Sequence, residues 1–172
     1  MSFKQTTQHA GSLREKGQAI KLVLLDVDGV MTDGRLWICS KGEIFKSFDV
    51  KDGIGLKRLL AKGVEVALVT GRKSKIVKRR AKELGITKVF QGVSDKRAIA
   101  RKLRTKMGLE RANVCAIGDD IPDLGLFEEA GLCVAVSDAV KEVREGADII
   151  TERRGGRGAV REVCEWILDS LA

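Results

Sequence analysis

Short apolar runs alternate with amphipathic stretches along most of this chain. Six of these runs have the length and character of buried strands, and they span residues 22–25, 64–69, 86–90, 114–117, 132–136 and 147–150. Apolar side chains at helical spacing mark the closing stretch, which contains Val160, Val163, Cys164, Ile167 and Leu171. Strands that alternate with helices predict an α/β fold, Rossmann-like and doubly wound, in which a mainly parallel sheet carries helices on both faces.

A different pattern follows the first strand, at residues 35–48. Two short apolar segments flank a turn over residues 40–42, which predicts a β-hairpin flap. The large apolar side chains of this hairpin are Trp37, Ile38, Ile44, Phe45 and Phe48. Such a hairpin would be an aggregation hazard on a monomer, so we expect it to pack against other copies of the chain.

The first residues of the chain are polar. Residues 1–18 contain no apolar signal region, and no apolar run in the chain is long enough to cross a bilayer. We therefore expect residues 1–18 to be a disordered or flexible extension. Residues 19–172 should form a single domain that has no membrane partner.

The charge of the chain bears on which partners it binds, and its cysteines bear on the cellular compartment in which it works. The formal net charge is +8, and residues 72–82 and 96–106 are strongly basic. Nucleic-acid binding is one explanation, but the chain has no tyrosine and an aromatic content of 4%, which leaves little for base stacking. We expect no nucleic acid, and an anionic substrate explains part of the excess charge. The cysteines lack C-x-x-C spacing, which indicates free thiols in a reducing, cytoplasmic compartment and no zinc site.

Candidate chemistry begins where the first strand ends. The apolar run is followed by Asp26 and Asp28, one residue apart, and then by Gly29. Residues two apart point to the same side of a strand, so both carboxylates can meet at the sheet edge where ligands bind. Clustered carboxylates favour Mg²⁺, which would keep Asp26 ionised as a nucleophile toward a phosphoryl group, while Asp28 transfers the proton. An acidic turn after a strand accounts for the same residues, so this motif alone leaves both interpretations open.

Three later segments place polar residues at comparable positions. Thr70 closes a strand, and its hydroxyl can hold phosphate oxygens or simply cap the next helix. Lys96 starts a helical stretch and can neutralise a phosphate, although most lysines are solvated. Asp119 follows another strand; it can complete a metal site with Asp26, supported by Asp123, or these acidic residues can favour a helix N-terminus.

The order of these residues along the chain resembles that of the haloacid dehalogenase-like superfamily of aspartate-nucleophile phosphohydrolases. The resemblance implies that Asp26 is the nucleophile and that Asp28 is the general acid and base. It also implies that Thr70 and Lys96 hold the phosphoryl group. Asp26, the backbone carbonyl of Asp28 and Asp119 would bind Mg²⁺. Superfamily ATPases usually have threonine at the position of Asp28, so a phosphatase or phosphomutase is favoured.

Four longer segments indicate one family within this superfamily. Residues 28–34, 48–53, 70–74 and 155–162 together resemble the 3-deoxy-D-manno-octulosonate 8-phosphate phosphatases, small cytoplasmic homotetramers of lipopolysaccharide biosynthesis. By this resemblance, the substrate site is lined by Asp28, Asp49, Val50, Lys51, Asp52, Gly53, Lys57, Arg72, Arg80 and Lys96. A sugar-acid phosphate carries a carboxylate and a phosphate, so several cations should converge on it. For Lys57 and Arg80 taken singly, a solvated helix face is the favoured interpretation, and Lys51 replaces an arginine that is frequent in the family.

The spacing of the motifs leaves no room for a cap domain. Only the hairpin and one helical stretch at 53–62 separate Gly29 from Thr70. A capless enzyme must exclude water in another way, so we expect a homotetramer in which a neighbour helps to close each site. The predicted reaction is Mg²⁺-dependent hydrolysis of 3-deoxy-D-manno-octulosonate 8-phosphate through an aspartyl-phosphate on Asp26. The alternatives are a nonulosonate (sialic-acid-like) 9-phosphate phosphatase and, less favoured by the motif order, a receiver-type phosphoacceptor signalling module.

Overall fold

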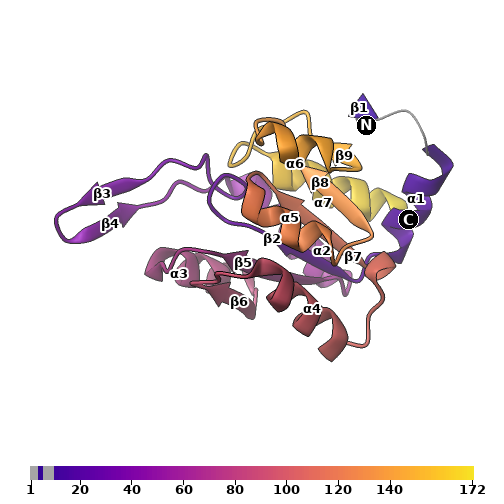
Figure 1. The fold of residues 1–172 in the computed structure, drawn as a ribbon, viewed down its shortest axis with the longest axis horizontal. Coiled ribbons are helices and arrows are strands. Elements are labelled where there is room, and N and C mark those ends of the chain that lie inside the picture. The colour runs from indigo at the N-terminus through magenta and orange to yellow at the C-terminus, as the bar shows by residue number, and fades with distance from the viewer. Residues whose placement is uncertain (1–3, 6–9) are drawn as a thin grey trace.

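A seven-stranded sheet organises the chain, of which the computed structural model describes residues 4–5 and 10–172 (Figure 1). The strand order is β1-β9-β8-β7-β2-β5-β6. The strands are β1 (Lys4–Gln5), β2 (Leu22–Leu25), β5 (Glu65–Thr70), β6 (Lys88–Gln91), β7 (Val114–Gly118), β8 (Leu132–Ala135) and β9 (Ile149–Ile150). All pair in parallel except the short β1, which is antiparallel to β9. The predicted doubly wound, mainly parallel sheet is confirmed.

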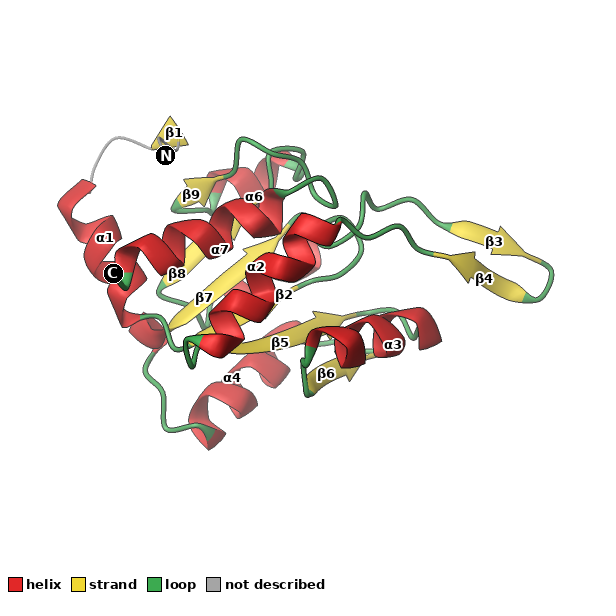
Figure 2. Cartoon of the chain, turned by 180° about the vertical axis from the view of Figure 1, so that it is seen from behind, coloured by secondary structure: helices red, strands yellow, loops and turns green. Residues whose placement is uncertain are grey.

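Helices cover both faces of this sheet (Figures 1 and 2). One layer contains α1 (Ala10–Ala19), α2 (Val50–Ala61), α3 (Lys75–Leu84) and α7 (Ala159–Ser170). The other layer contains α4 (Lys96–Lys106), α5 (Leu124–Phe127) and α6 (Lys141–Glu145), with the short 3₁₀ turns η1 (Arg111–Asn113) and η2 (Ile121–Asp123). Strands covered on both faces have no polar side, which is why the four residues of β2 are all apolar and fully buried. Among the described residues, no helix has the length and apolar character needed to cross a membrane.

The helices begin at polar caps that the sequence supplies. Asp49 accepts a hydrogen bond from the backbone N–H of Lys51 at 2.7 Å, so α2 starts earlier than its apolar pattern predicts. Asp95 caps α4 in the same way, through the N–H of Ala98 at 2.9 Å. These caps fix where each helix starts relative to the strand before it. The first turn of α4 thereby brings Lys96 close to the sheet.

The predicted hairpin forms a separate two-stranded sheet of β3 (Trp37–Cys39) and β4 (Gly42–Phe45). Figures 1 and 2 show that it projects well away from the body of the molecule. Trp37 and Phe45 stack with their ring centroids 4.9 Å apart, yet both remain almost half exposed. Ile38 and Ile44 are more than half exposed, at 59% and 55%. The hairpin therefore presents a large apolar surface to solvent in the single chain.

The N-terminal segment differs from the prediction where it is described. Residues 1–3 and 6–9 of the expected extension lie outside the described residues, but Ala10–Ala19 forms the helix α1. This helix packs against α7, and Lys16 forms a 2.8 Å ion pair with Asp148. Its polar sequence has only a weak amphipathic pattern, so the tertiary contact stabilises it rather than intrinsic propensity. Residues 10–18 are thus helical rather than irregular, and the division of the chain at residue 19 stays a prediction.

Candidate active site

The carboxyl ends of three neighbouring strands meet in the middle of the sheet. β2 pairs with β5 on one side and with β7 on the other. Asp26, Thr70 and Asp119 therefore stand at adjacent strand ends, at the point where the strand order reverses, which is where sheets of this kind bind ligands. From α4, Lys96 extends to the same place, with Nζ 2.9 Å from Asp26 Oδ1. The structure thus brings these four predicted site residues to one edge of the sheet.

Three carboxylates crowd this position. Asp26, Asp119 and Asp123 each place one oxygen within 4.8 Å of the others. Burial, followed by the charge of Asp123, raises the pKa of Asp26 to about 6. Burial and the charges of Asp123 and Asp26 raise the pKa of Asp119 to about 8, and its Oδ1 is buried without a hydrogen bond from any described residue. An all-oxygen cluster with an orphaned carboxylate oxygen fits a hard cation such as Mg²⁺.

Asp123 supports this cluster through both of its oxygens. Its Oδ1 accepts a hydrogen bond from Lys96 Nζ at 2.6 Å, and its Oδ2 accepts from the backbone N–H groups of Asp119 and Asp120 at 2.9 and 3.2 Å. Burial alone would lower the pKa of Lys96, but the charges of Asp26 and Asp123 outweigh burial and raise that pKa. Lys96 is therefore held as a cation beside Asp26, where it can bind a phosphoryl oxygen.

The backbone after β2 requires glycine. Gly29 has φ +99°, and a Cβ there would lie 2.0 Å from Asp119 Oδ2, so no other residue leaves room for that carboxylate. A second glycine packs behind the first, because a Cβ on Gly155 would lie 1.6 Å from the carbonyl oxygen of Gly29. The N–H of Gly156 donates to the carbonyl of Val30 at 2.9 Å. The glycine-rich segment near the C-terminus thus supports the loop that follows the first aspartate pair.

The Asp28 side chain contacts the base of the hairpin rather than the acidic cluster. Lys46, whose side chain is only 1% exposed, donates to Asp28 Oδ1 and lies 2.9 Å from Glu43 Oε1. Glu43 also accepts a hydrogen bond from Ser74 Oγ, and Arg72 Nε lies 3.8 Å from Asp28 Oδ2. Lys46, Glu43 and Ser74 were not among the predicted site residues. For Glu43 and Lys46, the signal in the sequence was a pair of opposite charges three residues apart in the hairpin; Ser74 had none.

Asp49 and Asp52, two of the predicted substrate residues, make structural contacts through their carboxylates. The Asp49 carboxylate caps α2, as described above. The buried Asp52 carboxylate accepts the backbone N–H groups of Gly158 at 3.3 Å and Arg161 at 2.7 Å, and burial raises its pKa to about 6. It therefore anchors the N-terminus of α7, and its place in the substrate site stays a prediction.

The remaining predicted substrate residues lie on α2 and α3. Val50, Lys51 and Lys57 are exposed, and among the described residues no hydrogen bond or ion pair links their side chains to the acidic cluster. Arg80 is different, because its guanidinium carbon lies 5.7 Å from the ring centroid of Phe48. Its Nε is buried and has no hydrogen-bond partner in the described part of the chain. Of these residues, Arg80 has the unmet hydrogen-bonding capacity that suits an anion.

Comparison with known proteins shows which family the chain resembles. A family model described as haloacid dehalogenase-like hydrolase matches residues 88–162. The chain is 44% identical over 153 residues to the 3-deoxy-D-manno-octulosonate 8-phosphate phosphatase KdsC of Escherichia coli (strain K12), covering 89% of this chain and 81% of that protein.

Solved structures show the same likeness. The 3-deoxy-D-manno-octulosonate 8-phosphate phosphatase of Moraxella catarrhalis, in complex with a magnesium ion, a phosphate ion and KDO, superposes with a TM-score of 0.90 at 44% identity, over 94% of this chain and 93% of that one. The cobalt-bound deoxy-D-mannose-octulosonate 8-phosphate phosphatase of Haemophilus influenzae gives a TM-score of 0.88 at 40% identity, over 91% of each chain.

Proposed function

The chain belongs to the haloacid dehalogenase-like hydrolases, in the family of the 3-deoxy-D-manno-octulosonate 8-phosphate phosphatases, and we propose that it hydrolyses 3-deoxy-D-manno-octulosonate 8-phosphate to 3-deoxy-D-manno-octulosonate and phosphate. The observation that carries the proposal is the 2.9 Å pair of Asp26 and Lys96 beside the acidic cluster. A carboxylate next to a buried ammonium group suits attack on a phosphoryl group whose oxygens the ammonium holds.

Asp26 is the nucleophile in this reaction. One of its oxygens attacks phosphorus, the ester P–O bond breaks, and Asp28 gives a proton to the departing sugar oxygen. Asp28 then takes a proton from water, whose oxygen attacks the phosphorus of the aspartyl-phosphate and releases Asp26 and inorganic phosphate. Thr70 and Lys96 hold the phosphoryl oxygens. Lys46 supports the role of Asp28 because it fixes that carboxylate through a contact with Oδ1.

We propose Mg²⁺ as the cofactor, held by Asp26, Asp119 and the backbone carbonyl of Asp28. Two observations support it: the orphaned Asp119 Oδ1 among three carboxylates, and the magnesium ion in the Moraxella catarrhalis relative. When bound, the cation supplies positive charge that offsets the carboxylates and the phosphoryl oxygens. Without it, the mutual repulsion of these carboxylates would oppose the approach of an anionic substrate.

Substrate turnover tests the proposal directly. Phosphate release is measured with Mg²⁺ on 3-deoxy-D-manno-octulosonate 8-phosphate, on a nonulosonate 9-phosphate and on p-nitrophenyl phosphate, with Asp26→Asn as the blank. We expect kcat/KM to be at least about tenfold higher on the octulosonate phosphate than on the nonulosonate phosphate. A preference for the nonulosonate would change the substrate but keep the chemistry. No turnover of any of the three would contradict the phosphatase and favour the phosphoacceptor module.

We also propose a cytoplasmic homotetramer in which copies of the hairpin pack together and help to cover each site. The exposed apolar side chains of Ile38 and Ile44 support it, because their burial between copies would remove an otherwise unfavourable surface. Light scattering on the double variant Ile38→Glu with Ile44→Glu should show smaller particles, and its activity should fall. Lys41→Glu, at the exposed turn of the same hairpin, is the matched control. A wild-type monomer with full activity would defeat the proposal.

A further inference from the structure

The positive charge of this protein is concentrated in one segment. Residues 72–106 contain 14 of the 32 lysines and arginines and only two of the 24 acidic residues. The rest of the chain therefore has more acidic than basic residues. The segment runs through α3, β6 and α4, which lie together along one edge of the sheet (Figure 1). We call α3, β6 and α4 the basic edge.

Several arginines of the basic edge are paired, whereas its exposed lysines are not. The fully buried Glu129 lies 3.0 Å from Arg101 and 2.9 Å from Arg104, so these arginines hold α4 against the turn that follows α5. Within the described residues, six exposed lysines have no hydrogen bond or ion pair through their side chains; they are Lys73, Lys75, Lys78, Lys82, Lys102 and Lys106. The proposed phosphatase chemistry uses none of these six charges. They are available to an anionic partner.

β6 is the last strand on its side of the sheet. It pairs with β5, no other described strand adds to it, and all four of its residues are partly exposed. The backbone N–H and C=O groups along such an edge can pair with an added strand. Lysines on an edge strand often prevent such pairing, but Lys88 is drawn back to Glu65 of β5 by a 2.7 Å ion pair. The outer edge is therefore left open.

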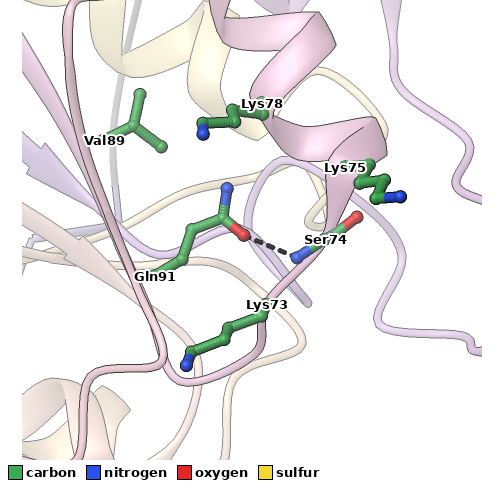
Figure 3. A pocket seen from close by; sticks show the side chains of 6 residues that line it. All are labelled: Lys73, Ser74, Lys75, Lys78, Val89 and Gln91. Carbon is green, nitrogen blue, oxygen red and sulfur yellow. Dashed lines mark hydrogen bonds between the residues drawn. The ribbon is translucent and has the colours of Figure 1, made fainter.

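Three hollows follow this open edge and share Val89. The first, of about 540 Å³, lies between β6 and the start of α3 (Figure 3). There Val89 and Gln91 project from the strand toward α3, and Lys78 reaches toward Val89. Gln91 Oε1 accepts the N–H of Ser74 at 2.5 Å, which orients that side chain. The second hollow, of about 340 Å³, continues along α3 past Lys82.

The third hollow lies on the α4 side of the strand and has a different chemistry. It has a volume of about 490 Å³. Its lining contains no lysine or arginine and combines the apolar Phe90, Val93, Ala98 and Ile99 with the polar Gln91, Ser94 and Asp95. Neighbouring side chains on a strand point to opposite faces, so Phe90 points away from the face of Val89. The hollows on the α3 side are thus lined by lysines, whereas the hollow on the α4 side has no basic residue and offers the apolar side chains of Phe90 and Ile99.

We propose that the basic edge binds an extended peptide segment of alternating acidic and apolar residues, which adds to the sheet as a strand beside β6. The backbone of the segment pairs with the open edge, and its side chains alternate between the two faces. The acidic side chains then face Lys75, Lys78 and Lys82, and the apolar ones enter the hollow beside Phe90 and Ile99. This site is independent of the proposed phosphatase reaction.

An acidic peptide fits the basic edge better than a second copy of the chain or a single-stranded nucleic acid does. A second copy pairing through its own β6 would bring two basic edges together, and like charges repel at that distance. A single-stranded nucleic acid would need aromatic side chains for stacking, and the basic edge contains one aromatic residue, Phe90. An acidic peptide strand can pair with the lysines of the basic edge and also with the open backbone N–H and C=O groups of β6.

The test uses the full chain and a defined probe. A fluorescein-labelled octapeptide of alternating glutamate and valine is titrated by anisotropy, and backbone amide shifts are recorded by NMR. Two control peptides alternate glutamate with proline, which removes backbone donors, and lysine with valine, which reverses the charge. The variant Lys75→Glu with Lys78→Glu and Lys82→Glu should weaken binding at least about tenfold. A matched triple, Lys21→Glu with Lys62→Glu and Lys141→Glu, changes the charge equally at exposed lysines elsewhere and should change binding less than about twofold.

The possible results distinguish strand addition from non-specific binding of anions and from pairing of two copies. Binding of the glutamate–valine peptide alone, with shifts at residues 88–91, supports strand addition. Equal binding of the glutamate–proline peptide or of duplex DNA would mean a non-specific polyanion surface and overturn the proposal. Concentration-dependent shifts at residues 88–91 without peptide would indicate pairing of two copies and overturn it as well, as would no binding. Phosphate release from p-nitrophenyl phosphate checks that each variant is folded.

Discussion

Replacing Asp119 with asparagine should stabilise the metal-free protein at alkaline pH. Burial and the charges of Asp123 and Asp26 raise the pKa of Asp119 from 3.8 to about 8. Between these two values the folded state binds a proton that the unfolded chain has already released. The stability of the metal-free protein therefore falls as pH rises through this range, because ionised Asp119 opposes folding.

The size of the effect follows from the pKa. Between about pH 5 and about pH 8, each unit contributes about 1.4 kcal/mol, so the ceiling is about 4 kcal/mol. Asp119 is only partly buried, and water and salt screen its charge, so we expect about 1–2 kcal/mol. Asparagine cannot ionise and should remove this part of the pH dependence.

Urea unfolding in EDTA at about pH 5 and at about pH 8 measures this pH dependence of stability. The free energy of unfolding of the Asp119→Asn protein should exceed that of wild type, and the difference should be larger at about pH 8 than at about pH 5. Asp169→Asn, at an exposed position of α7, removes the same charge away from the cluster and should leave the pH dependence unchanged. Added Mg²⁺ should stabilise wild type more than Asp119→Asn. If Asp119→Asn is the less stable protein at the higher pH in EDTA, carboxylate repulsion is not the dominant effect at this site.

Three further predictions test single side chains. Asp26→Asn should abolish phosphate release while circular dichroism stays unchanged, because a carboxamide is a poor nucleophile; substantial residual turnover would exclude the aspartyl-phosphate. Lys46→Met should lower kcat at least about tenfold through misplacement of Asp28, and steady-state kinetics with an unchanged kcat would show that the contact is dispensable. Asp52→Ala should lower the free energy of unfolding by about 2–3 kcal/mol, because two backbone donors at the start of α7 lose their acceptor. Asp52→Asn keeps an acceptor and should retain more than half of that stability in the same urea titration, and equal losses in the two variants would argue against the capping role.

Much of the fold was predictable because its signals are local. Each parallel strand is covered on both faces, so it is an unbroken apolar run that can be recognised without knowledge of its neighbours. The strand-end residues Asp26, Thr70 and Asp119 were predictable for the same reason, since each directly follows or closes such a run. Their meeting follows from the general rule that ligands bind at the carboxyl ends of parallel strands. The helix α1 escaped prediction because its stability comes from α7 rather than from its own sequence pattern.

The parallel sheet, the hairpin and the polar residues at the strand ends can be recognised in the amino-acid sequence, because they depend on side-chain periodicity within a few residues. The roles of the other polar residues depend on contacts between segments that are far apart in the chain. Lys46, which directly follows β4, pairs with Asp28 across 18 residues of sequence. Asp52 caps α7 across a separation of 106 residues to Gly158 and 109 to Arg161. Neither contact has a local signature, since a lysine in a hairpin and an aspartate in the first turn of a helix are ordinarily solvated. In the folded protein Lys46 and Asp52 are buried and must find polar partners. Their burial depends on how distant segments of the chain pack together.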